Sequence, residues 1–356
     1  MLIDKQIEKM IELGGSDLFL RAGSVSKLRL FGDIITIDEN IITAEHMFKI
    51  VKEIVPPESL ETLYARKNYE GAFYFKENWR MRVSVFYQRN SLALVIRKID
   101  LRIQDFEYLN LPGNVLKSLC KEKRGLILLT GTTGSGKSTA IASMIEHINK
   151  NFRFHVLSIE DPIEFTFTDK ESIINQREIG KDVETYSAAL RQFALHSPDV
   201  IFIGNIRDEE TMRAALEAAE TGVLVFSTLH TVNAPQTVER IISFFPTHQH
   251  TQVLMQLSQI LKGVVSVRLI PRKEGKGLVP SYEIMVLSPT VSRLIRESKI
   301  WEIPRYMEEG EIYGMMSFEQ CLIKLVREGK IHSEVAISTS DKKEELRLRL
   351  QNLGDS

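Results

Sequence analysis

The stretch GLILLTGTTGSGKSTAIASMIEHINK, Gly125 to Lys150, decides the fold because it joins an apolar run, a glycine-rich turn and an amphipathic segment. GLILLT has the composition of a buried strand. The segment after the turn carries apolar residues at helical spacing: Ile141, Met144, Ile145 and Ile148. The turn matches GxxxxGK[ST], the P-loop pattern. Because strand, loop, lysine, hydroxyl and helix follow in order, the pattern favours a phosphate site over a glycine-rich turn that binds nothing.

Each part of this loop has an expected role in binding a nucleotide. Glycines let the backbone amides turn toward the phosphates, and Lys137 supplies a positive charge to the β and γ oxygens. Ser138 is the expected ligand of a metal ion, and the helix that follows adds its dipole. The predicted cofactors are therefore ATP and Mg²⁺. The predicted cofactor-binding residues are Gly131, Thr132, Thr133, Gly134, Ser135, Gly136, Lys137, Ser138 and Thr139.

The chain has 356 residues, which is long enough for two domains. Its 46 Lys and Arg nearly cancel its 47 Asp and Glu, so we expect no nucleic acid partner. Cys120 and Cys321 lie far apart in the sequence and favour neither a disulfide framework nor a zinc site. The apolar runs are much shorter than the roughly 20 residues that a membrane-spanning helix needs. We therefore expect a cytoplasmic protein with no membrane span.

Two different patterns divide the chain. In residues 1–99, short alternating runs and amphipathic helices predict an α+β domain. The range 100–113, DLRIQDFEYLNLPG, is the expected linker. In 114–272, short apolar runs alternate with helical patterns, which predicts an α/β domain with a parallel sheet. Helical periodicity in 273–356 predicts a small helical subdomain at the end of the chain.

Polar residues follow several of these apolar runs, at the sheet edge where α/β proteins bind ligands. Glu160, Asp161 and Glu164 follow HVLSI, and one of them could polarise an attacking water, unless all are merely solvated. Asn205 follows DVIFIG at the place of a Walker B acid, where an amide adds no negative charge. His230 follows VLVFSTL and is either a γ-phosphate sensor or a structural hydrogen-bonding residue. The choice between Glu160 and Glu164 as general base stays open at this point.

The ordered motifs resemble a known family. GTTGSGKST, IEDPIEF, SPDVIFIGNIRD, STLH and RIISFFP look like the secretion ATPases, specifically the type IV pilus retraction ATPases of the PilT/PilU family. INQREIG and LMQLS lean toward the PilU branch. The sequence lacks the four-cysteine zinc insertion of extension and type II secretion ATPases. The resemblance implies a PAS-like domain at 1–99, a RecA-like core at 114–272, a ring of six subunits, and ATP between the two domains.

The same resemblance implies roles for single residues and for partners. Glu164 is expected to be the general base, and His230 is expected to be the histidine-box residue. Arg82 and Arg97 are expected to present guanidinium groups to the γ-phosphate, although by themselves they are typical of solvated strand residues. The implied partners are a homo-hexamer, a paralogous retraction ATPase, and a pilus platform protein at the cytoplasmic face of the inner membrane.

The chain departs from the family pattern at several positions. Asn205 replaces the Walker B Glu, Val223 replaces the His of ETGH, and Leu195 replaces the second Arg of the LRxxLR stretch. Val232 stands where the family has a small polar residue. Loss of a carboxylate that orients the metal's water is expected to slow hydrolysis by about 10²-fold or more, with a smaller effect on binding.

Three functions therefore compete. The first is an active motor that couples ATP hydrolysis to pilus retraction and twitching motility. The second is a nucleotide-binding accessory subunit with weak or no hydrolysis, which works with an active paralogue. The third is a pilus extension or type II secretion ATPase, which uses the same chemistry with the opposite direction of force.

Overall fold

The computed structural model describes residues 1–354 except 31, 77–78, 100–102, 194 and 276. The chain divides into two compact units, Met1–Arg102 and Ile103–Ser356. In the part of the chain that is described, no helix is both long enough and apolar enough to cross a membrane.

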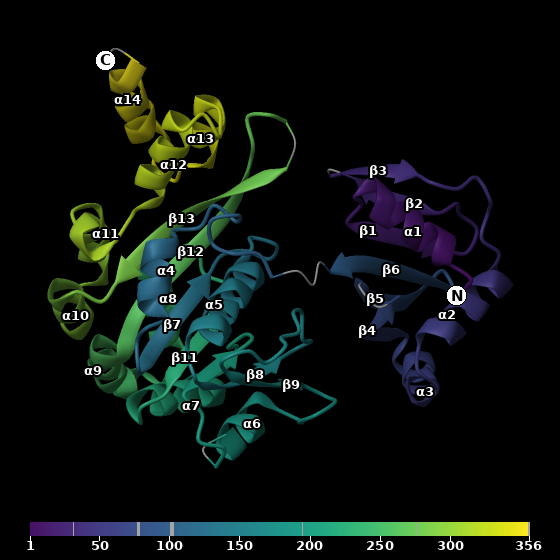
Figure 1. Ribbon diagram of the computed structural model, residues 1–356, viewed down its shortest axis with the longest axis horizontal. Coiled ribbons are helices and arrows are strands. Elements are labelled where there is room, and N and C mark those ends of the chain that lie inside the picture. The colour runs from purple at the N-terminus through teal and green to yellow at the C-terminus, as the bar shows by residue number, and fades with distance from the viewer. Residues whose placement is uncertain (31, 77–78, 100–102, 194, 276, 355–356) are drawn as a thin grey trace. The chain divides into compact units, whose positions relative to one another are not determined.

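The first unit is a six-stranded antiparallel sheet with three helices against one face (Figure 1). The strand order is β3-β2-β1-β6-β5-β4. The strands are β1 (Asp17–Arg21), β2 (Lys27–Leu30), β3 (Asp33–Thr36), β4 (Asn68–Phe75), β5 (Trp79–Gln88) and β6 (Ser91–Ile99). The helices are α1 (Asp4–Leu13), α2 (Ala44–Ile54) and α3 (Pro57–Arg66).

Local sequence signals set the helix boundaries in this unit. Helix α1 ends at Gly14, whose φ of 73° is the left-handed conformation that glycine adopts without strain. Helix α2 begins after Thr43, whose side chain accepts a hydrogen bond from the amide of His46, and Pro57 opens α3. These boundaries turn the apolar stripes of the helices onto the sheet, which agrees with the α+β domain predicted for 1–99.

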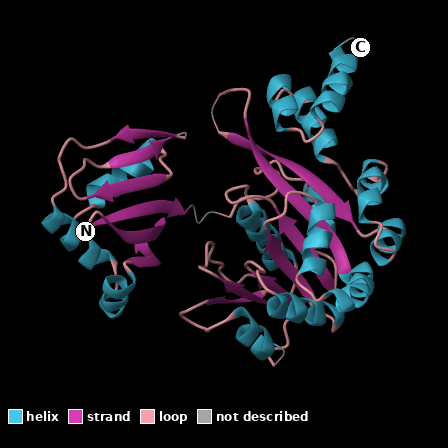
Figure 2. Ribbon diagram, turned by 180° about the vertical axis from the view of Figure 1, so that it is seen from behind, coloured by secondary structure: helices cyan, strands magenta, loops and turns pink. Residues whose placement is uncertain are grey.

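The second unit contains a seven-stranded sheet in the order β13-β12-β7-β11-β10-β8-β9. Every neighbouring pair is parallel except β12 and β13. The strands are β7 (Gly125–Thr130), β8 (His155–Glu160), β9 (Ile173–Glu178), β10 (Val200–Ile203), β11 (Leu224–Leu229), β12 (Leu261–Pro271) and β13 (Leu278–Val286). Figure 2 shows these strands with helices along both sides of the sheet.

Both faces of this sheet are buried. Leu126 and Leu128 of β7 pack into one hydrophobic cluster, whereas Ile127 and Leu129 pack into the other. A strand that is buried on both faces needs apolar residues at every position, which explains why GLILLT does not alternate. One face is covered by α4 (Gly113–Leu119), α5 (Lys137–Asn151), α12 (Phe318–Arg327), α13 (Ser333–Thr339) and α14 (Lys343–Gly354). The other face is covered by α6 (Tyr186–Phe193), α7 (Glu209–Glu220), α8 (Ala234–Ser243), α9 (His250–Ile260), α10 (Pro289–Arg296) and α11 (Ile303–Glu308), with short 3₁₀ turns η1 (Thr247–Gln249), η2 (Ile300–Glu302) and η3 (Glu311–Tyr313).

Strand β13 lies inside 273–356, the range for which the sequence predicts only helices. It pairs antiparallel with β12 from Gly263 to Pro271, whereas β12 pairs with β7 only as far as Ser266. The sequence pattern missed this strand because Pro280 interrupts its apolar run. On an edge strand a proline costs little, since the outer side of the strand needs no ladder hydrogen bonds. The helices of this region begin after Ser288, which caps α10.

The expected linker, 100–113, falls partly on residues 100–102, which lie outside the described residues. From Ile103 onward the chain belongs to the second unit. Phe106 is 2% exposed and packs in the same hydrophobic cluster as Leu116 and Ile145. Its ring centroid lies 5.7 Å from that of His147 on α5. Burial of this aromatic side chain therefore joins most of 103–113 to the core of the second unit.

The central strand β11 should be the part of the core most sensitive to loss of volume. Phe226 is fully buried on it. We expect Phe226→Ala to lower the free energy of unfolding by about 3–5 kcal/mol, because it removes buried apolar surface and leaves a cavity. Urea unfolding measures this loss. Trp301→Ala is the control, because Trp301 is 72% exposed and its loss should cost less than about 1 kcal/mol.

Candidate active site

The nine P-loop residues join β7 to the first turn of α5. Gly134 and Gly136 have φ values of 78° and 95°, which favour glycine. A Cβ on Gly131 would lie 2.4 Å from the Val267 carbonyl oxygen and 2.5 Å from Ser135 Oγ. The loop therefore needs glycine both for its backbone conformation and for its close approach to β12.

The chemistry of this loop fits a phosphate. Lys137 is 7% exposed, and its Nζ donates to the carbonyl oxygens of Gly131 and Thr132, both at 2.8 Å. Burial lowers the pKa of Lys137, and the charge of Glu164 partly offsets this. Ser135 Oγ is buried and has no hydrogen-bond partner within the described chain. A buried cation, a helix N-terminus and an unsatisfied hydroxyl together suit an anion with several oxygens.

The acidic residues after β8 divide into a buried one and a more accessible one. Glu160, the last residue of β8, is 7% exposed, and burial raises its pKa from 4.5 to about 7. Hydrogen bonds from Ser158 Oγ (2.8 Å) and Gln176 Nε2 (3.1 Å) to Glu160 Oε1 partly oppose that shift. Glu164 is only half-buried, and its charge acts on Lys137. The structure therefore favours Glu164 over Glu160 as the acid that faces a bound phosphate.

Asn205 and His230 meet at the ends of the parallel strands β10 and β11. Asn205 Nδ2 lies 3.3 Å from His230 Nε2. Because Nδ2 can only donate, Nε2 accepts and the ring proton is on Nδ1. Burial and the charges of Lys137 and Arg207 lower the pKa of His230, which favours the neutral ring. Asn205 Oδ1 is buried and has no partner within the described chain.

Five of the residues predicted from the sequence thus come together at one sheet edge in the second unit. They are Lys137, Ser138, Glu164, Asn205 and His230. The two predicted arginines belong to the first unit, where Arg82 and Arg97 are directly opposite each other on β5 and β6. Arg82 Nη2 is paired with Glu70 Oε2 at 3.2 Å, and Arg97 Nε is paired with the buried Asp17 Oδ1 at 2.7 Å.

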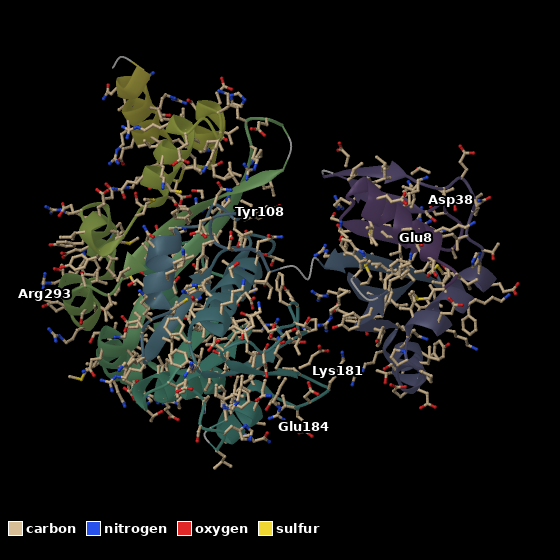
Figure 3. The ribbon with its side chains drawn as sticks, in the orientation of Figure 1. Glu8, Asp38, Tyr108, Lys181, Glu184 and Arg293 are labelled. Carbon is tan, nitrogen blue, oxygen red and sulfur yellow. The ribbon has the colours of Figure 1, made fainter. Side chains whose placement is uncertain are left out.

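Sequence reasoning missed a cavity of about 550 Å³ beside the P-loop. Its lining includes Ser135, Gly136 and Thr139 of the loop, and it continues onto the end of the β12–β13 pair. The other lining residues are Tyr108, Leu109, Leu111, Ala140, Val267, Leu269, Arg272, Leu278 and Pro280. Tyr108, labelled in Figure 3, lies in the stretch that the sequence assigned to a linker. No sequence motif marks the lining residues outside the P-loop, and those on the β12–β13 pair come into view only once β13 is placed.

The positions that depart from the family pattern have different surroundings. Leu195 is 83% exposed, so an apolar side chain faces solvent where an arginine is expected. Val223 is partly buried against the core beneath β11. Of these positions, Asn205 alone makes a hydrogen bond with another candidate site residue within the described part of the chain. Asn205 is therefore the one of these positions that lies beside another candidate site residue, His230.

Comparison with known proteins identifies the family. The model for type II/IV secretion system proteins matches residues 1–351. The chain belongs to this family. The type IV pilus ATPase PilU of Pseudomonas aeruginosa is 38% identical over 351 residues, which are 99% of this chain and 92% of PilU. The retraction ATPase PilT of the same organism is 38% identical over 323 residues, which are 91% of this chain and 93% of PilT.

Solved structures agree. The crystal structure of a pilus retraction motor PilT with bound ADP matches with a TM-score of 0.89 and 42% identity, over 97% of this chain and 98% of that one. The ATPase DotB of Legionella pneumophila matches with a TM-score of 0.82 at 23% identity over 94% of both chains, and it shows the fold alone. The predicted fold class and the predicted resemblance to the PilT/PilU family are confirmed.

The raised pKa of Glu160 predicts a dependence of stability on pH. Its neutral form is favoured in the folded protein, so its contribution is complete below about pH 4.5 and is lost as the pH rises through about 7. We expect Glu160→Gln, which stays neutral, to gain stability relative to wild type between about pH 5 and 8, by an order of 1–3 kcal/mol. Urea unfolding of wild type and of Glu160→Gln, at about pH 5 and at about pH 8, measures the difference in their free energies of unfolding. An equal difference at the two pH values would contradict this.

The hydrogen bond between Asn205 and His230 predicts a shift in the charge state of the histidine. We expect Asn205→Asp to raise the pKa of His230 by about one unit or more, because an adjacent carboxylate favours imidazolium. Diethylpyrocarbonate reacts with the neutral imidazole ring. The extent of carbethoxylation at His230, quantified by mass spectrometry across a range of pH, therefore measures the pKa of this ring. His248, exposed in η1, serves as the internal control. An unchanged midpoint at His230 would contradict the expected contact.

Proposed function

We propose that this protein is a hexameric ATPase of the type IV pilus machine, which couples ATP binding and hydrolysis to pilus retraction and twitching motility. One observation carries the proposal. The P-loop, the acidic loop of residues 161–167 and His230 lie at one sheet edge in a chain that is 38% identical to PilU over 99% of its length. The proposal includes a location at the cytoplasmic face of the inner membrane, docking on the pilus platform protein, and cooperation with a paralogous ATPase.

The residues of the second unit divide the chemistry among them. Lys137 and the loop amides bind the β and γ oxygens of ATP. Ser138 would hold Mg²⁺, which neutralises charge on the phosphates when it is bound. Glu164 orients the attacking water and accepts its proton. His230, whose Nε2 already accepts from Asn205, offers its Nδ1–H to the γ-phosphate.

The cavity beside the P-loop is the proposed place for the base and ribose. It adjoins Gly136 and Thr139, so a nucleotide with its phosphates in the loop would extend into it. Leu269 and Leu111 give it apolar walls, and Tyr108 adds an aromatic side chain with a polar end. Such a lining suits a planar base with a few polar edges.

The arginines of the first unit would contribute differently. The pair of Arg82 with Glu70 is exposed, and such pairs are typically worth about 0–1 kcal/mol, so Arg82 can readily exchange its partner for a phosphate. Arg97 contacts Asp17 through Nε, and its two terminal nitrogens have no partner among the described residues, so they could bind an anion. In the proposed mechanism both guanidinium groups stabilise charge on the transferring phosphoryl group.

A second candidate is a nucleotide-binding accessory subunit that works with an active paralogue. The amide of Asn205 favours it, because an amide cannot supply the negative charge of a Walker B carboxylate. In this case the P-loop, the cavity and His230 would still bind ATP, and hydrolysis would be slow.

Phosphate release from the purified protein separates these candidates. We expect wild type to exceed Lys137→Ala, and Asn205→Glu to exceed wild type by about 10–100-fold, because the restored carboxylate orients the metal's water. ATP affinity, measured by calorimetry, should change far less in Asn205→Glu than in Lys137→Ala. Equal rates of wild type and Lys137→Ala with intact ATP binding would favour the accessory subunit. If wild type neither binds ATP nor exceeds Lys137→Ala in phosphate release, the proposed function is wrong.

A further inference from the structure

Gln176 on β9 directs its side-chain amide at Glu160 and at the acidic loop, defined as residues 161–167. Its Nε2 donates to the Phe165 carbonyl oxygen at 2.8 Å and to Glu160 Oε1 at 3.1 Å. Its Oε1 accepts from the Phe167 amide at 3.0 Å. A glutamine amide has two N–H groups and one carbonyl oxygen, and all of these are used here. The side chain therefore connects the end of β8 to the loop that follows it.

A second residue of β9 holds the other side of Glu164. Glu178 Oε2 accepts from the Ile163 amide at 3.3 Å. Gln176 and Glu178 are two positions apart, so they lie on the same face of the strand. Glu178 forms an ion pair with Lys181, which Figure 3 labels in the loop between β9 and α6. The backbone on both sides of Glu164 is thus attached to one strand, at Ile163 and at Phe165.

Glu164 itself lies outside any helix or strand. Its backbone is held by these attachments and by its own amide, which donates to the Glu160 carboxylate, and not by a regular hydrogen-bond ladder. A general base must lie within about 3 Å of the proton that it accepts, and a displacement of about 1 Å can cost about 10²-fold in rate. Contacts that fix the loop on either side of the base therefore bear directly on turnover.

We propose that Gln176 is a positioning residue that holds the acidic loop so that Glu164 faces the P-loop. This inference rests on the proposed function, because it assigns Gln176 a part in the same hydrolysis. It adds a residue from INQREIG, a stretch that the motif analysis used only to compare branches of the family.

The chemistry of the contact explains why an amide is needed. Leucine would keep most of the volume but would leave the Phe165 carbonyl and the Phe167 amide without this partner. Glutamate could still accept from Phe167, but it would lose both donors and place a second carboxylate beside Glu160. Leucine and glutamate at 176 therefore remove different parts of the same set of contacts.

Two measurements on the full-length protein test the proposal, in wild type and in the Asn205→Glu background. Hydrogen exchange followed by mass spectrometry reports on peptides that cover 163–167. Steady-state phosphate release gives kcat and KM for ATP. Gln192→Leu is the matched control, because Gln192 Oε1 accepts from Arg177 of the same strand at 2.6 Å and lies on α6.

We expect Gln176→Leu to speed exchange in 163–167 by about 10-fold or more, because it removes the acceptor of the Phe167 amide. It should lower kcat by about 10-fold or more and leave KM for ATP within about 3-fold. Gln176→Glu should lower kcat with a smaller change in exchange at Phe167. Gln192→Leu should change none of these quantities by more than about 2-fold.

Unchanged exchange in Gln176→Leu would overturn the inference, whatever the ATPase rates are. A parallel loss of kcat, ATP affinity and melting temperature would also overturn it, since that pattern indicates general destabilisation. If neither wild type nor Asn205→Glu exceeded Lys137→Ala in phosphate release, the proposed function and the part of Gln176 in hydrolysis would both fail. The exchange rates would still show whether Gln176 holds the loop.

Discussion

The parallel pairing of β7, β11, β10 and β8 is the constraint on which the candidate site depends. Parallel strands bring their carboxyl ends to one edge, so residues more than 90 positions apart become neighbours without any local sequence relation. Lys137 follows β7, Glu164 follows β8, Asn205 follows β10, and His230 follows β11. The mostly apolar sequences of these strands fix this arrangement, because each strand is buried on both faces.

Much of the fold and of the candidate site could be predicted from the sequence, for physical reasons that differ between residues. The P-loop has a local pattern, since glycines, lysine and hydroxyl all act within nine residues. Glu160 and Glu164 were visible as acids after an apolar run, but burial separates them, and burial depends on the neighbouring strand β9. Gln176 could not be found in the same way, because its partners lie 9 to 16 residues away and glutamine is common on strands. Strand β13 was missed because its proline is tolerated only at a sheet edge.

The electrostatics of the site depend on an amide at 205, where the family resemblance leads us to expect a carboxylate. A carboxylate at 205 would accept a hydrogen bond from His230 and favour a charged ring. The amide Nδ2 donates instead, which suits the neutral tautomer whose proton is on Nδ1. A carboxylate at this position would therefore add one negative charge and also favour one positive charge on the ring. The combined charge of residue 205 and His230 thus differs less between an amide and a carboxylate at 205 than the charge of the acid alone suggests.

The β12–β13 pair has a mechanical consequence. From Val267 onward β12 has β13 as its only neighbour among the described strands, so this end of the sheet is a two-stranded ribbon. Two-stranded ribbons twist and bend more readily than the interior of a wide sheet. Leu269 and Pro280, which line the cavity, stand on this compliant part, whereas the P-loop is anchored to the rigid interior through β7. The two ends of a bound nucleotide would therefore meet surfaces of unequal stiffness, and the softer of the two contacts the C-terminal helical region, where Arg268 of β12 forms an ion pair with Asp341.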